Sequence, residues 1–340
     1  MTPALTIATT VLFFSLFSTS SSSSSACNKH DEKALLAFKS SFHYNTLTSW
    51  SKSTDCCSSW DHVGCDSGTG RLTSLHFSND YENPRPVSLN GSIPATIGDL
   101  PYLESLTFSR VDGLRGRIPS RLAKLEKLKH LVIYLTRVSG PVPPLLSKVT
   151  ALTPLSLAGN RLSGAIPPSL GSLVHLTDMV LSGNRLRGSI TTSLFNKLAN
   201  LTTLDLSRNR LTGPIPRSLA GLSSLAFVLF HGNRLTEDAS FLFGRSRLVS
   251  QLNLAGNELA FDFSRVKFPL SMGYMDVSHN KIYGSISAQI TELTRLSYTW
   301  ATISFAERYR AEGASHCSVR TPMRTTNAYA ENHCSHASKR

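Results

Sequence analysis

The stretch LTTLDLSRNRLTGPIP (residues 201–216) contains the pattern that decides the fold of this chain. LTPLSLAGNRLSGAIP (152–167) and LTDMVLSGNRLRGSIT (176–191) repeat its leucines, asparagine and glycine at matching positions. The shared frame is L-x-x-L-x-L-x-x-N-x-L-x-G-x-I-P, and nine copies are legible. A fixed period of this length is typical of a repeat architecture. The frame asparagines, spaced 23 to 25 residues apart, are Asn160, Asn184, Asn209, Asn233, Asn257 and Asn280.

The leucines and the asparagine of the frame each have a structural reason. In the L-x-L step, alternate side chains point to one side, as in a short β-strand. The asparagine is expected to point inward and to hydrogen-bond the backbone of the turn, whose buried polar groups would otherwise be unpaired. No single repeat can bury its own leucines, so neighbouring repeats must stack. The predicted fold is an α/β solenoid, a right-handed superhelix with a parallel sheet on its concave face.

A solenoid exposes apolar residues at its ends unless they are capped. Residues 27–70 have the features of an N-terminal cap, and DEKALLAFKSSF (31–42) predicts a helix whose leucines and phenylalanines face the first repeat. One zinc site is the weaker interpretation of the cysteines here, because adjacent cysteines cannot easily serve one tetrahedral ion. Two disulfides are therefore expected. The four cysteines are Cys27, Cys56, Cys57 and Cys65.

The N-terminus has the composition of a secretory signal peptide. Residues 2–25 have no charged side chain and contain the apolar run VLFFSLF (11–17), so residues 1–26 are predicted to be removed on export. No later stretch reaches the ~20 apolar residues of a membrane-spanning helix, so the mature protein is predicted to be secreted, without a membrane span. Six cysteines and two glycosylation sequons, at Asn90 and Asn200, agree with an extracellular location.

Several segments outside the repeat frame resemble one family. The cap, IGDLPYLESL (97–106), SRVKFP (264–269) and NKIYGSI (280–286) are similar to the plant polygalacturonase-inhibiting proteins, which are extracellular leucine-rich-repeat proteins. The resemblance covers about residues 27–295. It implies disulfide-capped repeats, a location in the plant cell wall and inhibition of fungal pectin-degrading enzymes. It also implies the disulfide pairs Cys27–Cys56 and Cys57–Cys65.

The repeats are expected over residues 71–295, and the sequence after them departs from the family. The resemblance implies a tenth repeat with N-x-L-C-G-x-I-P and a cap with C-L-C-G-x-P-L-P, and neither is present. Codons compatible with residues 300–310 can encode VGHNLLCGTIP when read one nucleotide upstream. In the same frame, residues 328–334 can encode a C-L-C-G motif. We hypothesise a frameshift near residues 295–299, and we expect residues 296–340 to be poorly ordered as written.

The sequence offers little for catalysis. It has no metal-spaced set of histidines and cysteines, no G-x-S-x-G motif and no glycine-rich phosphate loop. Asp178 and Asp205 are predicted to lie ~7–8 Å apart on neighbouring strands, which overlaps the carboxylate spacing of inverting glycosidases. An open sheet provides no enclosed subsite that would raise the pKa of one acid. We therefore expect no enzyme activity, no metal and no cofactor.

The exposed positions of the predicted parallel sheet form columns, because its strands lie ~4.8 Å apart. The central column contains Val132, Ser156, Val180, Asp205, Leu229, Asn253 and Asp276. Apolar residues on an exposed face, mixed with carboxylates and aromatic rings, are typical of protein interfaces. The alternative is scattered surface hydrophobes, which are common. We predict a partner-binding face made of Tyr134, Asp178, Val180, Asp205, Phe227, Leu229, His231, Asn253 and Asp276.

The position after the frame asparagine, or its equivalent, is arginine in five consecutive repeats. Stacking would align these residues as a stripe of cations, which could bind an acidic polysaccharide such as pectin. The alternative is a solvated loop edge where any polar residue would serve. Nucleic acid could also bind such a stripe, but a secreted chain rarely meets it, so no nucleic-acid partner is expected. The five residues are Arg137, Arg161, Arg185, Arg210 and Arg234.

The combined prediction is a secreted plant defence protein that binds and inhibits microbial polygalacturonases through its concave face. Inhibition would be steric, with Val180, Asp205, Phe227, Leu229 and His231 at the centre of the contact. The rival hypothesis is a leucine-rich-repeat protein without inhibitory activity, which would bind a peptide or receptor in signalling or development. A fold of this kind supports many partners, so the sequence leaves both hypotheses open.

Overall fold

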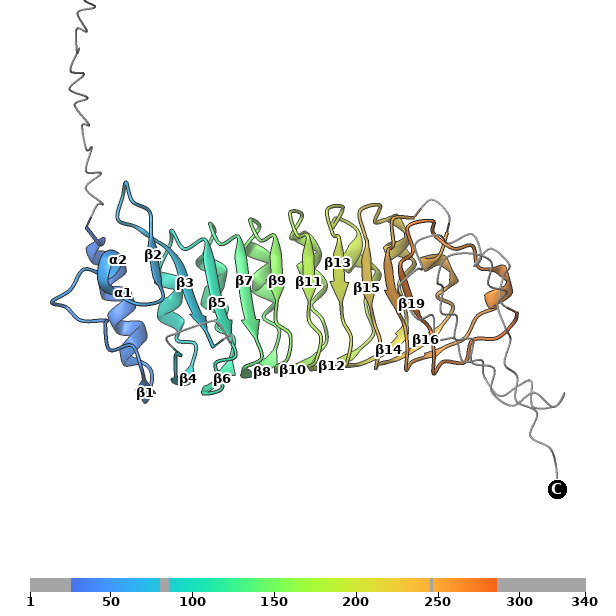
Figure 1. Ribbon diagram of the computed structural model, residues 1–340, viewed down its shortest axis with the longest axis horizontal. Helices are drawn as coiled ribbons and strands as arrows, with labels where there is room; N and C mark the ends of the chain where they lie inside the picture. The colour runs from blue at the N-terminus through green and yellow to red at the C-terminus, as the bar shows by residue number, and fades with distance from the viewer. Residues whose placement is uncertain (1–25, 80–85, 245–246, 286–340) are drawn as a thin grey trace, which may run out of the picture.

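The computed structural model describes residues 26–79, 86–244 and 247–285. Nearly all of the predicted signal peptide lies outside these residues, as does the whole predicted tail with the hypothesised frameshift. The described residues form an elongated stack, with the N-terminal cap at one end in blue and the last described repeat at the other in orange (Figure 1). Among the described residues, no helix combines the length and apolar character needed to cross a membrane.

Helix α1 (Lys29–Ser40) begins the cap. Its N-cap is Asn28, whose side chain accepts a hydrogen bond from a backbone N–H two residues on. The apolar face of the helix buries Leu35 and Phe38 against the first repeat. Asp31, the predicted first residue of the helix, lies instead in its first turn. Its buried carboxylate accepts hydrogen bonds from the side chain of Arg71 and from the N–H of Leu72, where the first repeat begins. The predicted helix start was two residues too late, because the side chain that caps the first turn is that of Asn28.

Two disulfides close the rest of the cap. They join Cys27 to Cys56 and Cys57 to Cys65, with Cα–Cα distances of 5.4 and 5.5 Å. The pairing that the family resemblance implies is therefore confirmed. These links restrict the unfolded chain and so favour the folded cap. The short elements of this region are β1 (Tyr44–Asn45), α2 (Cys56–Ser59) and β2 (Val63–Cys65).

Within the described residues, ten strands form the main sheet, which is the sheet predicted for the concave face (Figure 1). β2 is antiparallel to β3, and every later strand is parallel to its neighbours. The predicted parallel sheet is confirmed. After β2, its strands are β3 (Leu72–Ser78), β5 (Ser105–Ser109), β7 (His130–Tyr134), β9 (Pro154–Ser156), β11 (Asp178–Val180), β13 (Thr203–Asp205), β15 (Phe227–Leu229), β17 (Gln251–Asn253) and β19 (Tyr274–Asp276).

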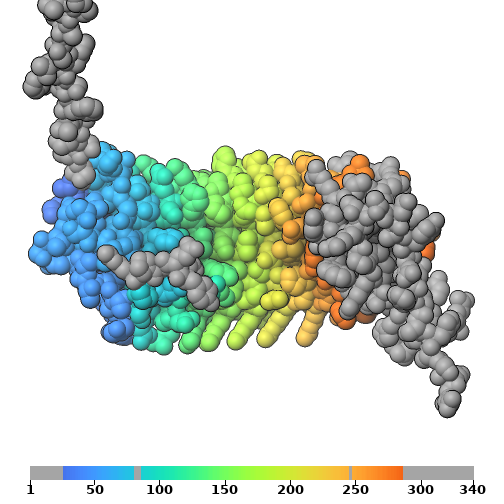
Figure 2. Space-filling model, in the orientation of Figure 1, coloured from blue at the N-terminus to red at the C-terminus, as the bar shows by residue number. Residues whose placement is uncertain are grey.

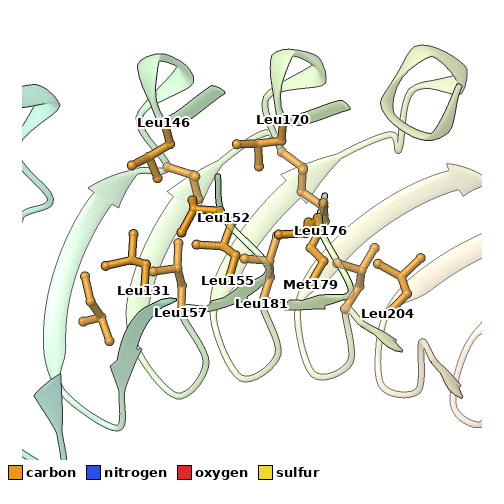
Figure 3. Close-up of a cluster of buried hydrophobic side chains, with 14 of the residues drawn as sticks. Leu131, Leu146, Leu152, Leu155, Leu157, Leu170, Leu176, Met179, Leu181 and Leu204 are labelled. Carbon is orange, nitrogen blue, oxygen red and sulfur yellow. The ribbon is translucent and has the colours of Figure 1, made fainter. Parts of the chain in front are cut away.

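The leucines of the frame build one continuous core behind this sheet. Figure 3 shows Leu155 and Met179, from two neighbouring strands, pointing toward Leu146 and Leu170 of the helical turns. All four are at most 1 % exposed. Burying a side chain of this size stabilises the fold by ~1.5–3 kcal/mol. Because each leucine is covered partly by the next repeat, the stability of one repeat depends on its neighbours.

A second sheet follows the lower edge of the stack in the view of Figure 1. This sheet was not predicted, because the frame signals only a bend after the asparagine. Its strands are β1, β4 (Leu89–Ser92), β6 (Leu114–Arg117), β8 (Arg137–Pro141), β10 (Arg161–Gly164), β12 (Arg185–Gly188), β14 (Arg210–Pro214), β16 (Arg234–Glu237) and β18 (Glu258–Leu259). β1 is antiparallel to β4, and the later strands are parallel.

The G-x-I-P step connects this second sheet to a row of 3-10 helices. Gly188 and Gly213 have φ of 82° and 76°, which glycine adopts without strain. Pro167 and Pro216 are the N-caps of the helices that follow. The helices are η1 (Ala95–Asp99), η2 (Ser120–Lys124), η3 (Pro144–Lys148), η4 (Pro168–Ser172), η5 (Thr192–Phe195), η6 (Arg217–Gly221), η7 (Ser240–Leu242) and η8 (Phe263–Arg265).

The frame asparagines form the predicted internal ladder. The Nδ2 of Asn209 donates to the backbone oxygens of Leu181, Leu206 and Ser207 at 3.0–3.1 Å. Its Oδ1 accepts a hydrogen bond from the N–H of Leu186 at 3.0 Å. One side chain therefore ties the end of a main-sheet strand to a strand of the second sheet. Because the residue is buried, its loss would leave the N–H of Leu186 unpaired and would remove three hydrogen bonds to backbone oxygens.

The residue before the ladder position has a left-handed backbone in eight consecutive repeats. A side chain there costs ~1–2 kcal/mol, because the Cβ approaches the following carbonyl, whereas glycine has no such cost. We call these eight residues the rim. With their φ angles, they are Arg110 (57°), Leu135 (48°), Gly159 (69°), Gly183 (64°), Arg208 (52°), Gly232 (68°), Gly256 (64°) and His279 (53°).

Candidate protein-binding interface

The register of the main sheet aligns the predicted central column. Val180 is paired with Ser156 on one side and Asp205 on the other. Leu229 follows Asp205 in the next strand, and Asn253 follows Leu229. Because these strands are parallel and unshifted, their outward side chains lie in one row across the sheet. The sequence predicted this row from repeat length alone.

A second row runs beside the first and contains the most exposed apolar residue of the sheet surface. Asp178 is paired with Thr203, which is paired with Phe227. Phe227 is 36 % exposed, whereas Val180 and Leu229 are half-buried. The three apolar side chains come from two strands, Val180 from β11 and the other two from β15, with β13 between them. They form the centre of what we call the concave patch, which also includes Asp178, Asp205, His231, Asn253 and Asp276.

The polar residues of the central row have a structural task that the sequence analysis missed. Asp205 Oδ1 accepts hydrogen bonds from the N–H and Oγ of Ser207, at 3.0 and 2.6 Å. Asn253 Oδ1 accepts from the N–H two residues on at 3.1 Å, and Asp276 Oδ1 does the same at 3.0 Å. Such side-chain caps stabilise the turn at the end of each strand. In the sequence, this capping role was indicated by the D-x-S spacing of residues 205–207 and 276–278.

Three aspartates of the concave patch each have one carboxylate oxygen without a hydrogen bond in the described part of the chain. In Asp178, Oδ2 accepts a hydrogen bond from Thr177 at 2.7 Å. For Asp178, Asp205 and Asp276, no hydrogen bond to the second carboxylate oxygen and no ion pair occurs within the described part of the chain. The carboxylates are therefore held in place by one oxygen and remain open to a cation through the other.

His231 lies at the edge of the concave patch and is partly buried. Burial lowers the pKa of its imidazole, and Arg208 lowers it further, whereas Asp205 and Asp276 act in the opposite direction. Its Nδ1 is buried and has no hydrogen-bond partner among the described residues. The neutral ring therefore has one unused nitrogen facing the protein. In the last strand, burial and Asp276 raise the pKa of Tyr274.

Tyr134 does not join the concave patch. It ends β7, and β9 separates that strand from β11, where Asp178 lies. Its ring instead lies 5.9 Å from the guanidinium of Arg110. Tyr134 is thus a peripheral member of the predicted binding face.

The geometry of the main sheet gives no enclosed site for catalysis. Asp178 and Asp205 are diagonal neighbours, as predicted, on an open surface. A cavity of about 490 Å³ lies elsewhere, near the ends of β16 and β18. Two carboxylates on its wall are already paired, Asp238 with Arg217 at 3.0 Å and Asp262 with a nearby arginine at 3.1 Å. No residue of the concave patch lines this cavity.

The five predicted arginines each begin a strand of the second sheet, and all are exposed. Figure 2 shows a regular row of side chains projecting along the edge where these strands lie. The register slips by two residues in each repeat from β8 onward, so Arg161 is paired with Ser139 and Arg234 with Thr212. The stripe therefore runs obliquely across the strands instead of along one straight column.

Three further arginines on this sheet were missed. Arg115 is paired directly with Arg137, and Arg187 with Arg210. Arg117 follows on the same strand as Arg115. Among the residues that the structure describes, none of these eight arginines forms an ion pair. Only Arg187 had a signal in the repeat pattern, since it is the second x of the R-x-x-G step in RLRG (185–188).

The two sequons differ in their surroundings. Asn90 lies in β4, where it is paired with Tyr44 and is half-buried. Asn200 is exposed, and its Nδ2 donates to the backbone oxygen of Val174 at 3.0 Å. Glycosylation of either residue stays a prediction.

Comparison with known proteins agrees with this architecture. The family described as Leucine rich repeat N-terminal domain matches residues 28–66, and leucine rich repeat families match residues 155–173 and 174–235. A plant ice-binding protein of known structure has a TM-score of 0.73 and 39 % identity, over 81 % of this chain and 86 % of that one.

Curated relatives span most of the chain. The polygalacturonase inhibitor of Pyrus communis is 51 % identical over 271 residues, which are 79 % of this chain and 79 % of the relative. The leucine-rich repeat protein FLOR 1 of Arabidopsis thaliana is 45 % identical over 283 residues, or 83 % of this chain and 84 % of the relative. With the repeats, the capped N-terminus and this extent of identity, the chain belongs to the polygalacturonase-inhibitor family of leucine-rich-repeat proteins.

Proposed function

We propose that this protein binds microbial polygalacturonases with its main sheet and inhibits them by covering their substrate cleft. The observation that carries the proposal is the concave patch, in which Val180, Phe227 and Leu229 are accessible beside three aspartates. Interfaces of this composition gain most of their affinity from a few aromatic and apolar anchors. The names of the relatives supply the identity of the partner.

The charge of the patch supports this partner. A polygalacturonase acts on a polymer of uronic acids, so its cleft must present cations to the carboxylates of the substrate. Asp178, Asp205 and Asp276 each offer an unpaired carboxylate oxygen to such cations. Complementary charges of this kind raise the association rate and fix the orientation of the complex.

The proposed contact consists of the predicted residues in two tiers. Phe227 and Leu229 are the central anchors, because they occupy neighbouring positions of the two rows. Val180, Asp205 and His231 surround them, and Asp178, Asn253 and Asp276 extend the contact along the sheet. Tyr134 contributes only if the partner reaches β7. Inhibition is steric, so no residue of this chain needs to act as an acid, base or nucleophile.

We propose a separate role for the arginines of the second sheet. Their guanidinium groups are exposed and form no ion pair with any described residue, which supports binding of pectin, a polyanion with regularly spaced carboxylates. This contact tethers the protein in the plant cell wall and leaves the main sheet free. The solvated-edge alternative predicts that the arginines are dispensable for pectin binding.

Secretion to the cell wall belongs to the same proposal. The two disulfides of the cap are the kind of link that persists in an oxidising compartment. A fluorescent reporter fused to the C-terminus of the full chain should appear in apoplastic wash fluid. Reporter retained inside the cells would contradict this location.

The second candidate function is ligand binding in signalling or development, without inhibition. This second function is supported by the 45 % identity with FLOR 1, a relative that is not named as an inhibitor. The same concave patch would then bind an endogenous peptide or receptor.

Titration of a panel of fungal polygalacturonases with the secreted protein separates these functions. Sugar release from polygalacturonate is the readout, and inhibition of at least one enzyme is expected. Phe227→Ala should weaken inhibition by roughly 30-fold, the range of a central hot spot. The control is Tyr44→Ala, because Tyr44 is a 59 % exposed aromatic residue on the second sheet. Absence of inhibition across the panel would favour the signalling function.

A further inference from the structure

Among the rim residues before the last described repeat, one has a side chain that no contact in the described residues explains. Four rim residues are glycines, so the left-handed turn can be made without any side chain. Two of the others have a local reason to differ. The Arg110 guanidinium lies over the Tyr134 ring, and the Leu135 side chain fills the space above Gly159, where a Cβ would come within 2.5 Å of it. His279 lies in the last described repeat.

Arg208 has no such reason. Its side chain is exposed, and its guanidinium has no hydrogen bond or ion pair in the described part of the chain. Only the base of the side chain is close to Gly232, where an added Cβ would lie 3.6 Å from Arg208 Cγ. The residue therefore keeps a strained backbone, with φ of 52°, and gains no contact from it. Strain that the fold does not require is a sign of function.

The position of Arg208 connects it to the concave patch. It follows Asp205 by three residues, and its N–H donates to the backbone oxygen of His231 at 2.7 Å. The adjacent rim residues, Gly183 and Gly232, have no side chains. A partner seated on the main sheet thus meets a single cation between two stretches of bare backbone.

We propose that Arg208 is a specificity-determining contact of the inhibitor, pairing its guanidinium with a carboxylate at the cleft of the polygalacturonase. Glycoside hydrolases use a pair of carboxylates at the cleaved bond, so a protein that covers the cleft comes close to acidic groups. The planar guanidinium can bind a carboxylate through two parallel hydrogen bonds. The inference rests on the proposed inhibition of polygalacturonases, and it adds a cation to a contact that is otherwise acidic and apolar.

The test is Arg208→Gly, which separates a functional residue from a structural one. The variant should be at least as stable as the unmodified protein, with a melting temperature unchanged or raised by up to about 2 °C. Inhibition of the most sensitive polygalacturonase of the panel should be weaker by roughly 10-fold at low salt, and the difference should shrink at high salt. A stabilising change that reduces inhibition is not expected from a residue that only supports the fold.

Two further variants serve as controls. Lys197→Ser removes an equal charge from an exposed side chain that follows η5 and lies outside both sheets, so inhibition should stay within twofold. Arg208→Lys keeps the charge and the left-handed backbone but loses the planar fork. It should show an intermediate loss of inhibition.

The results distinguish the two levels of the proposal. If the unmodified protein inhibits and Arg208→Gly inhibits equally well, the role of Arg208 is wrong and the proposed function stands. If Lys197→Ser loses as much inhibition as Arg208→Gly, net charge explains the effect, and the specific contact is wrong. If the unmodified protein inhibits no polygalacturonase, the proposed function fails, and the inference about Arg208 fails with it.

Discussion

The main sheet and the second sheet are built from the same repeats, yet equivalent positions carry different kinds of residues. On the main sheet, one row contains valine, aspartate and leucine in neighbouring strands, at Val180, Asp205 and Leu229. On the second sheet, the first residue of five consecutive strands is arginine. A row of unlike residues matches one particular surface, whereas a row of identical cations matches a ligand that itself repeats.

The two sheets also differ in register. Main-sheet strands are aligned without a shift from β9 to β19, so unlike side chains gather in a compact patch. In the second sheet, each strand from β8 to β16 slips by two residues, which spreads the arginines obliquely. A compact patch favours a folded partner, and a long oblique stripe favours a flexible polymer. The comparison therefore predicts that the two activities can be removed separately.

The largest effect should come from Asn209→Ala, because Asn209 links the two sheets. The substitution leaves the buried N–H of Leu186 without a partner, at ~1–3 kcal/mol before relaxation. It also removes one of the two asparagine hydrogen bonds to each of the backbone oxygens of Leu181 and Leu206, at ~0.5–1.5 kcal/mol each. We expect the free energy of unfolding in urea to fall by roughly 3–5 kcal/mol, with loss of both activities. A loss below about 1 kcal/mol would mean that water replaces the side chain.

Replacement of Arg137, Arg161, Arg185, Arg210 and Arg234 by serine should remove one activity only. At about 0.5 kcal/mol for each exposed charge pair, pectin affinity at low salt should fall roughly 50- to 100-fold. Stability should change by less than about 0.5 kcal/mol for each exposed site, and inhibition should be unaffected. Retention on a pectin column, compared at low and high salt, is the measurement. Unchanged retention would identify the stripe as a solvated edge.

Asp205 allows charge and structure to be separated on the main sheet. Asp205→Asn keeps the oxygen that caps Ser207 but removes the charge, so inhibition should fall about 10-fold without loss of stability. Asp205→Ala also removes the cap and should cost about 1 kcal/mol of unfolding free energy. If the asparagine variant inhibits as well as the unmodified protein, Asp205 is a structural cap and no more.

The smallest expected effect concerns the pH dependence of stability. Burial lowers the pKa of His231, so the unfolded state binds a proton more readily than the folded state. Stability from the neutral ring is present above the unfolded pKa of ~6.5 and is lost as the pH falls through the lower folded pKa. His231→Gln should therefore become more stable relative to the unmodified protein at pH 5 than at pH 7.5. The difference should be about a few tenths of a kcal/mol, because the ring is only partly buried.

Much of the main sheet could be predicted, because the repeat length and the buried leucines allow only one alignment of neighbouring strands. The row through Val180 and Asp205 follows directly from counting residues in each repeat. The disulfide pairs depended on the family resemblance, since four cysteines alone allow three pairings. The second sheet was missed because its pairing comes from the stacking of neighbours, and its two-residue slip has no counterpart in the spacing of the frame.

Local chemistry explains the remaining differences. The helix start at Asn28 depends on which of two polar residues caps the first turn. The capping role of Asp205 competes with its role as an exposed carboxylate, and only the geometry of the turn reveals it. The strain at Arg208 is invisible in the sequence because arginine and glycine stand at equivalent positions of otherwise similar repeats.

The account depends most on the main sheet being the side that meets the enzyme. One repeat offers a matched pair for this test, since Thr203 lies between Asp178 and Phe227 on the main sheet and Thr212 is exposed on the second sheet. We would measure the inhibition constant of Thr203→Trp and Thr212→Trp against the same polygalacturonase. The account predicts that the first variant loses inhibition by about 30-fold or more and that the second inhibits normally. Equal inhibition by both, or loss confined to Thr212→Trp, would contradict it.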